Sequence, residues 1–257
     1  MNMRLLLSVL WSILWLSSAS AQTLYVAAAS DLVYCLEDIN QQFKRQYPQA
    51  QIKVTTGSSG NFLAQIKQNA PYEVYLSADS RYPKQLISEN MADGQSFYVY
   101  AIGQIALWTN KKTIDLKQGW AVLDQTNITR VAIANPEHAP YGQAARNALQ
   151  QAKLWTNIQS KLVFGENIAQ TLQFAQTGNA DLAIVALSLL RSPQLAGQGQ
   201  FWLIPAHLYP PLEQAMVITK RGQQNPLAYQ YASFIKSTSA QKIFAKYGFL
   251  PPARNLP

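Results

Sequence analysis

The chain has 257 residues, and its contents of 48% hydrophobic and 11% aromatic residues exclude an intrinsically disordered protein. Only 13% of the residues are charged, and 21 Lys and Arg against 13 Asp and Glu give a formal net charge of +8. The basic residues form no run longer than a pair, so the excess does not indicate a nucleic-acid-binding protein. We expect a mostly solvated basic surface that weakly attracts anions.

The first 21 residues have the pattern of a secretory signal peptide. Arg4 precedes an apolar run from Leu5 to Leu16, and Ala19-Ser20-Ala21 fits a cleavage site of small residues. The run has about 12 residues, against roughly 20 for a membrane span, which disfavours a membrane anchor. We therefore predict export to a periplasm and a mature chain that starts at Gln22. We expect no lipid anchor, because no cysteine lies at the cleavage site. The remaining length suffices for one large or two modest domains.

The residues usually found at catalytic and metal sites are scarce. The single cysteine, Cys35, lies in an apolar context and predicts an inert core residue. The two histidines, His138 and His207, have no cysteine or carboxylate at ligand spacing, which disfavours a zinc site. The segment Gly57-Ser58-Ser59-Gly60 does not match the G-x-S-x-G pattern of hydrolases. The sequence thus predicts a binding protein with no cofactor and no bare metal cation, rather than an enzyme.

The first half of the chain alternates strands and helices. Apolar runs predict strands at 23–29, 51–55 and 73–76, and an apolar stripe predicts a helix from Ser30 or Asp31 to about Tyr47, before Pro48. Further helices are expected at 61–69 and from Tyr82 onward. This β-α-β-α-β-α order is typical of a parallel sheet with right-handed crossovers.

The second half repeats the alternation after a long strand-like segment, Tyr98 to Asn110, that could cross between two lobes. Strands are predicted at 130–134, 162–164, 182–186 and 201–204, and helices at 140–154 and 167–177. A linker with Pro210-Pro211 then leads to a returning strand at 214–219 and to helices at 226–237 and 240–247. We expect an α/β fold of two lobes, each a mostly parallel sheet flanked by helices, joined by a two-segment hinge. Lobe I comprises 22–101 and 214–257, and lobe II comprises 102–213.

Four predicted strand-to-helix corners contain small or hydroxyl-bearing residues and no lysine or arginine. They are Ala27 to Asp31, Gly57 to Asn61, His138 to Gly142, and Gly165 to Ile168. Helix N-termini present unpaired N–H groups and the positive end of the helix dipole, so several of them in one cleft would bind a small anion. Because a carboxylate would repel that anion, we expect Asp31 to face solvent or to cap a helix. His138 is expected to have a structural role.

The segments VAAASDL, TGSSGNF, NPEHAPYGQAA, GEN, GNADLAIV and FAKYGF occur in this order between Val26 and Phe249. Together they resemble the molybdate-binding periplasmic proteins of ABC transporters, a resemblance that covers Thr23 to about Leu250. It implies a periplasmic-binding-protein-like (type II) fold that closes over molybdate or tungstate. It also implies delivery to a membrane permease. We expect a monomer, and the charge pattern described above argues against nucleic-acid binding.

The resemblance implies a ligand set of hydroxyl groups and backbone amides. Ser30 and Ser59 would donate by their side chains, and Tyr141 and Ile168 by their backbone amides; Ser58 is an alternative to Ser59. A fifth family position, often a tyrosine, aligns with Ala186, which has no side-chain donor. The Tyr141 phenol is a candidate substitute for the missing hydroxyl.

A pocket lined only by donors would reject a protonated anion, because its O–H would face an N–H without an acceptor. This excludes phosphate in part, because phosphate is partly protonated at neutral pH. Sulfate differs from molybdate and tungstate in being smaller. Neither property distinguishes molybdate from tungstate. The alternative function is a receptor for another small oxyanion, such as sulfate or phosphate, or for a carboxylate. A carboxylate receptor would normally use an arginine, and these corners contain none.

Overall fold

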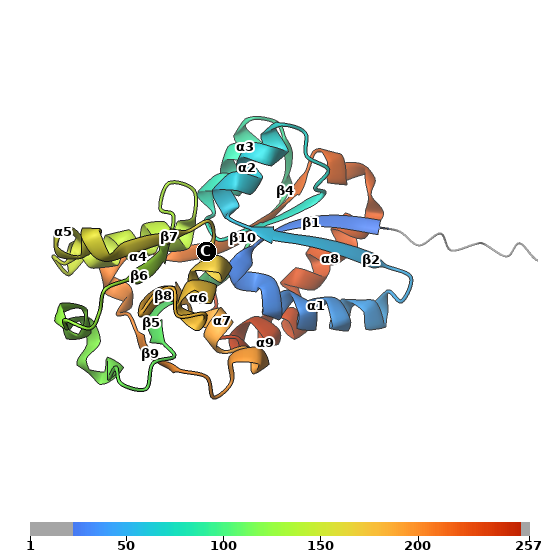
Figure 1. Cartoon of the computed structure of the whole chain (residues 1–257). Helices are drawn as coiled ribbons and strands as arrows, with labels where there is room; N and C mark the ends of the chain where they lie inside the picture. Colours follow the sequence, from blue (N-terminus) through green and yellow to red (C-terminus); the bar gives the residue numbers. More distant parts are fainter. Residues whose placement is uncertain (1–22, 253–257) are drawn as a thin grey trace, which may run out of the picture.

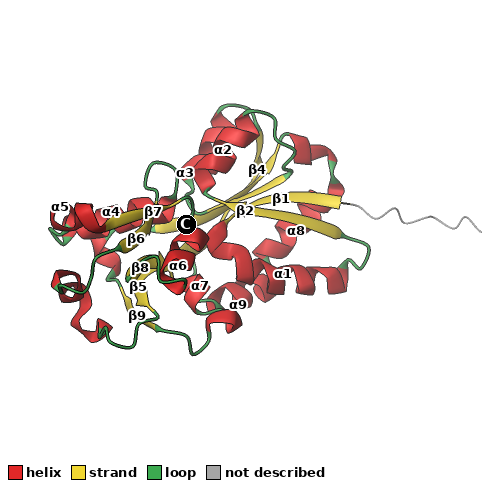
Figure 2. Cartoon of the chain, viewed as in Figure 1, coloured by secondary structure: helices red, strands yellow, loops and turns green. Residues whose placement is uncertain are grey.

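The computed structural model describes residues 23–252, so the predicted signal peptide lies outside the described residues. Two five-stranded sheets, each flanked by helices, form two lobes that lie side by side (Figures 1 and 2). Among the residues described, no helix is long and apolar enough to cross a membrane.

The first sheet has the strand order β2-β1-β3-β10-β4. Its strands are β1 (Thr23–Ala29), β2 (Gln51–Gly57), β3 (Val74–Ser77), β4 (Ala92–Gly103) and β10 (Leu212–Thr219). β1 pairs in parallel with β2 and β3, whereas β10 is antiparallel to both β3 and β4. The sheet is therefore mixed, with its parallel part at the β-α-β-α-β pattern that the sequence predicts.

Helices cover both faces of this sheet (Figure 1). One face carries α1 (Val33–Gln46), α8 (Pro226–Lys236) and α9 (Thr238–Lys246), and the other carries α2 (Ser59–Lys67) and α3 (Arg81–Ser88). Because successive strand residues point to opposite faces, Val26 packs against the first group and Ala27 against the second. Both faces are buried, which explains why β1 is an almost continuous apolar run.

The second sheet has the order β7-β6-β8-β5-β9. Its strands are β5 (Ile105–Thr109), β6 (Val131–Ala134), β7 (Leu162–Gly165), β8 (Leu182–Ala186) and β9 (Gln200–Leu203). β6 pairs in parallel with β7 and β8, and β5 is antiparallel to β8 and β9. Its helices are α4 (Pro140–Gln151), α5 (Trp155–Ile158), α6 (Ile168–Gln176) and α7 (Leu187–Leu190).

Short 3₁₀ helices connect several of these elements. They occupy Ser30–Leu32, Leu116–Asp124, Gln159–Lys161, Pro193–Leu195, Ala206–Leu208 and Arg221–Gln224. The first of them replaces the expected first turn of α1, so the α-helix begins at Val33 rather than at Ser30 or Asp31.

The chain passes between the sheets twice. The strand-like segment predicted at 98–110 consists of two strands, β4 in the first sheet and β5 in the second, with Gln104 between them. The return runs from β9 to β10 through residues 204–211, which include Pro210 and Pro211. At the first crossing, a Cβ on Gly103, the last residue of β4, would overlap the Tyr141 hydroxyl of α4, so only glycine permits this approach.

Candidate functional site

The four corners singled out in the sequence lie at the carboxyl ends of β1, β2, β6 and β7, and contacts between the lobes bring them together. The Ala169 amide at the start of α6 donates to Ser30 Oγ at 3.4 Å. The Gly60 amide donates to the His138 carbonyl oxygen at 2.9 Å, and Asn61 Nδ2 donates to Glu166 Oε1 at 2.7 Å. Ligands of open α/β sheets bind at such strand ends. The candidate site therefore lies between the lobes.

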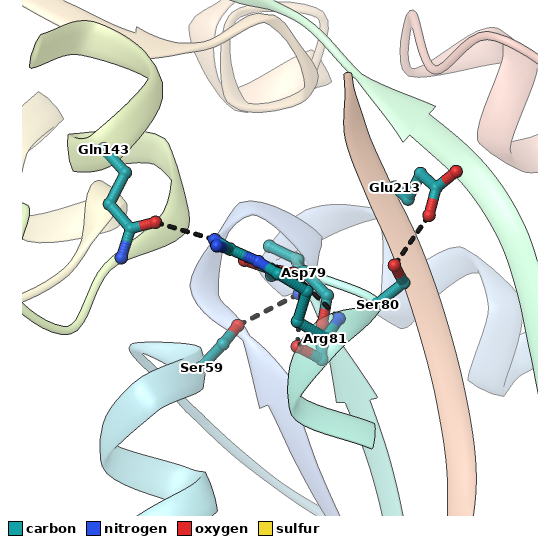
Figure 3. A network of polar contacts seen from close by, with 8 residues as sticks. Ser59, Asp79, Ser80, Arg81, Gln143 and Glu213 are labelled. Atoms are coloured by element: carbon teal, nitrogen blue, oxygen red, sulfur yellow. Dashed lines mark hydrogen bonds and ion pairs between the residues drawn. The ribbon is translucent and has the colours of Figure 1, made fainter. Parts of the chain in front are cut away.

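Ser59 begins α2 and has a buried hydroxyl group. Its Oγ accepts a hydrogen bond of 3.0 Å from the Ala78 amide, so an oxygen lone pair is engaged while the hydroxyl hydrogen can point elsewhere (Figure 3). The Ser59 carbonyl oxygen also accepts from the Tyr75 hydroxyl at 2.7 Å, which fixes the start of the helix. The Ser59 side chain is thus held in place by an accepted hydrogen bond, and its hydroxyl hydrogen can donate to another group.

Ser30 and Ser58 differ in how far their hydroxyl groups are engaged. Ser30 is buried directly after β1, and its Oγ accepts from the amide of Ala169, which leaves the hydrogen to donate. Ser58 is the N-cap of α2 through the Asn61 amide, and its Oγ also shares a 2.9 Å hydrogen bond with His138 Nδ1. The contacts of Ser58 therefore cap a helix and connect the lobes.

Tyr141 and Ile168 lie in the first turns of α4 and α6, where amides have no acceptor within the helix. Asn167 Oδ1 accepts from the amides of Ala169 and Gln170 and leaves that of Ile168 available. Ala186 is fully buried at the end of β8 and offers no side-chain donor. The two amides thus lie at helix starts that favour an anion.

The Tyr141 phenol, considered above as a substitute donor, is engaged elsewhere. It donates to Asp31 Oδ2 at 2.9 Å and lies 3.1 Å from Gln214 Nε2. The phenol proton is therefore used within a contact between the lobes.

The expectation that Asp31 faces solvent or caps a helix is wrong. Its side chain is buried, with 1% of the residue exposed, and it caps no helix. Oδ2 accepts from Tyr141, which is 110 residues away in sequence, and from Gln214, which is 183 residues away. Burial raises the pKa of Asp31 to about 7, although these hydrogen bonds lower it. Distant donors of this kind give no local sequence signal.

Further polar contacts join the lobes beside the candidate residues. Arg81, the first residue of α3, donates through Nη2 to Gln143 Oε1 of α4 at 2.9 Å and also pairs with Asp79 (Figure 3). His138 Nε2 lies 3.7 Å from Glu166 Oε1. These contacts describe a closed arrangement of the lobes.

A cleft of about 340 Å³ opens next to Arg81 and Gln143, but none of the predicted ligand residues lines it.

The charge pattern at the site fits an anion held by neutral donors. The candidate donors are the hydroxyl groups of Ser30 and Ser59 and the amides of Tyr141 and Ile168, and none of them carries a positive charge. Among the described residues, no group of three or more His, Cys, Asp or Glu could hold a metal ion. The arrangement can bind a compact oxyanion.

Known proteins similar to this chain are also solute-binding proteins. The family model described as "Bacterial extracellular solute-binding protein" matches residues 24–250. The chain is 37% identical to the molybdate-binding protein ModA of Azotobacter vinelandii, over 90% of this chain and 91% of that protein. It is 36% identical to ModA of Rhodobacter capsulatus, over 90% of each chain.

A solved structure gives the same relationship in three dimensions. The periplasmic molybdate-binding protein of Azotobacter vinelandii matches with a TM-score of 0.84 and 33% identity, over 90% of this chain and all of that one. The predicted type II fold and the predicted resemblance are confirmed, and the family supports a binding protein rather than an enzyme. The chain belongs to the bacterial extracellular solute-binding proteins, in the family of the ModA molybdate-binding proteins.

Proposed function

We propose that this protein captures molybdate, and equally tungstate, outside the cytoplasmic membrane and delivers it to the permease of an ABC transporter. The observation that carries the proposal is the meeting of four donor-bearing corners between two lobes, without a cationic side chain among the candidate ligands. The family relationship to ModA proteins of two bacteria supports the choice of anion.

We assign four donors to the anion. The hydroxyl groups of Ser30 and Ser59 would each donate one hydrogen bond, because the oxygen of each already accepts from a backbone amide. The amides of Tyr141 and Ile168 would donate from the first turns of α4 and α6. Ser58 and Ala186 would line the pocket, Ser58 as a cap and interlobe contact and Ala186 by its shape alone.

Binding is coupled to closure because each lobe supplies half of these donors. Ser30 and Ser59 belong to the first lobe, and Tyr141 and Ile168 to the second. Closure excludes water and lowers the local dielectric constant, which strengthens each hydrogen bond to the charged guest. The permease would recognise the closed surface, and we expect the receptor to act as a monomer.

Isothermal titration calorimetry tests the proposal on the mature wild-type protein. We expect one molybdate or tungstate per chain, with sulfate and phosphate bound at least 100-fold more weakly. Sulfate affinity equal to that of molybdate would assign the site to another oxyanion. Molybdate should also raise the melting temperature, since a ligand of the folded state stabilises it by mass action.

A further inference from the structure

Asp31 is a buried carboxyl group that the proposed ligand set does not use. It follows Ser30 directly, and its Oδ2 accepts two hydrogen bonds, from Tyr141 Oη at 2.9 Å and from Gln214 Nε2 at 3.0 Å. Its other oxygen, Oδ1, has no hydrogen-bond partner among the described residues. A buried charged oxygen without a partner is costly, whereas a protonated one is not charged.

Among the described residues that shift the pKa of Asp31, none carries a positive charge that would balance its carboxylate. The titratable groups that face it are Tyr141 of α4, Tyr100 of β4 and Cys35 of α1, and burial raises the pKa of each. All three are therefore neutral at physiological pH. Desolvation raises the pKa of Asp31 to about 7.

The burial of Asp31 depends on both lobes. Tyr141 and Ser188, whose Oγ donates to the Asp31 carbonyl oxygen at 2.8 Å, belong to the second lobe, whereas Asp31 belongs to the first. Receptors of this kind usually close around a ligand by a hinge motion. The reverse motion, opening, would separate these contacts and admit water. The carboxyl group would then return toward the ordinary aspartate pKa of about 3.9.

We propose that Asp31 takes up a proton when the lobes close over the oxyanion, so that this protein binds its anion more tightly as the pH falls. The inference rests on the proposed function, because it needs an anion that closes the lobes. Asp31 acts as a positioning residue here, since its neutral form maintains the contact with Tyr141 without repelling the guest.

The direction of the pH effect follows from the two states. In the closed state Asp31 keeps its proton up to about pH 7, whereas in the open state it loses the proton above about pH 4. Between these two pH values, closure over the anion therefore takes up nearly one proton. Affinity should fall about tenfold from pH 6 to pH 8 and level off above. The number of protons taken up should be about 0.9 at pH 6 and about 0.1 at pH 8.

Calorimetry of molybdate binding in buffers of different ionisation enthalpy measures this number directly. Asp31→Asn is the informative variant, because the amide oxygen can accept from Tyr141 and Gln214 as the neutral acid does. We expect it to bind with no proton uptake from this position and with an affinity constant within about twofold from pH 6 to pH 8. Asp38→Asn, the same change at a partly exposed position paired with Lys246, should behave as wild type.

The outcomes separate the two proposals. Proton uptake by wild type that disappears in Asp31→Asn supports the inference, and any uptake that does not involve Asp31 cancels in the difference between these proteins. Molybdate binding without uptake at pH 6, or with equal uptake in Asp31→Asn, overturns the inference and leaves the function intact. If no oxyanion binds, both proposals fail. Carbon-13 NMR of labelled aspartate carboxyls in the loaded wild type, where one should titrate near pH 7, provides the test without a substitution.

Discussion

Two neighbouring serines have different tasks because of where α2 begins. Ser58 is the N-cap, so its hydroxyl group turns back to the Asn61 amide, and it also contacts His138. Ser59 is the first residue inside the helix, and its Oγ turns instead to the Ala78 amide. One residue of register thus decides which hydroxyl group serves the helix and the lobe contact, and which can serve a ligand.

Replacing Ser59 by alanine tests its role as a donor. We expect molybdate affinity to fall by about 10- to 100-fold, because a hydrogen bond to a charged group contributes about 1.5–3 kcal/mol. The Ala78 amide also loses its acceptor, so the unfolding free energy should fall by about 1–3 kcal/mol. Calorimetry and urea unfolding measure the two effects. Ser233→Ala, at an exposed position of α8, is the matched control; unchanged affinity in Ser59→Ala would remove Ser59 from the ligand set.

Local pattern predicts the backbone of this site better than its side-chain contacts. The corners that end β1, β2, β6 and β7 follow from apolar runs and helix-start residues, so the sequence places Ser30, Ser59, Tyr141 and Ile168 at strand ends. The environment of Asp31 depends on Tyr141 and Gln214, which only the folding of both lobes brings near. Its burial therefore contradicts an expectation based on charge alone.

At the scale of elements, Gly60 shows how closely α2 approaches the loop before α4. Its amide donates to the His138 carbonyl oxygen across the cleft, and a Cβ there would lie 2.6 Å from that oxygen. The obstruction involves backbone of the other lobe, which cannot yield as a side-chain end can. It exists only while the lobes are closed.

Gly60→Ala should therefore weaken binding without weakening the fold. Steric overlap in the closed state costs about 1–3 kcal/mol, which corresponds to about 10- to 100-fold in molybdate affinity. In the open state alanine favours the helix by up to about 1 kcal/mol, so ligand-free stability should stay equal or rise. Gly94→Ala, whose nearest neighbour would be Ile87 Cγ2 at 3.4 Å, controls for the substitution itself. A loss of stability with unchanged affinity would contradict the closed-state clash.

Asp181 joins elements within the second lobe. Its Oδ2 accepts from the amides of Thr129 and Arg130 before β6, and its Oδ1 pairs with Lys111 after β5. Burial alone would raise the pKa of Asp181, but Lys111 and these hydrogen bonds lower it to about 2. The charged carboxylate thus stabilises the junction of three strands.

The pH dependence of stability follows from this lowered pKa. The folded-state value lies below the unfolded value, so the contribution is present above about pH 4 and is lost as the pH falls through about 2. Asp181→Asn should lower the unfolding free energy by about 2 kcal/mol at pH 7, and the difference from wild type should be about half as large near pH 3. Urea unfolding at several pH values measures it; a difference that does not vary with pH would assign the effect to packing.

At the scale of the whole molecule, the sequence predicts the two α/β halves but not the pairing that makes each sheet mixed. The antiparallel β10 and β5 lie beside parallel strands because the chain crosses between the lobes twice, next to Gly103 and through residues 204–211. Strand orientation at a crossing depends on the placement of the lobes, which periodicity does not encode. In the proposed function, closure would turn about these same two crossings.

The net charge of +8 in the whole chain should steer anions to this hinged site. Glu166 opposes the effect at the rim, where its carboxylate accepts from Asn61 of the other lobe. Glu166→Gln keeps an acceptor for Asn61 and removes one negative charge. Stopped-flow measurement should show molybdate association about two- to threefold faster at low salt, and the advantage should vanish near 1 M salt, where the Debye length is about 3 Å. Asp124→Asn, the loss of one exposed negative charge outside the four corners, should have a smaller effect; equal acceleration would show that total charge, rather than the field at the rim, determines the rate.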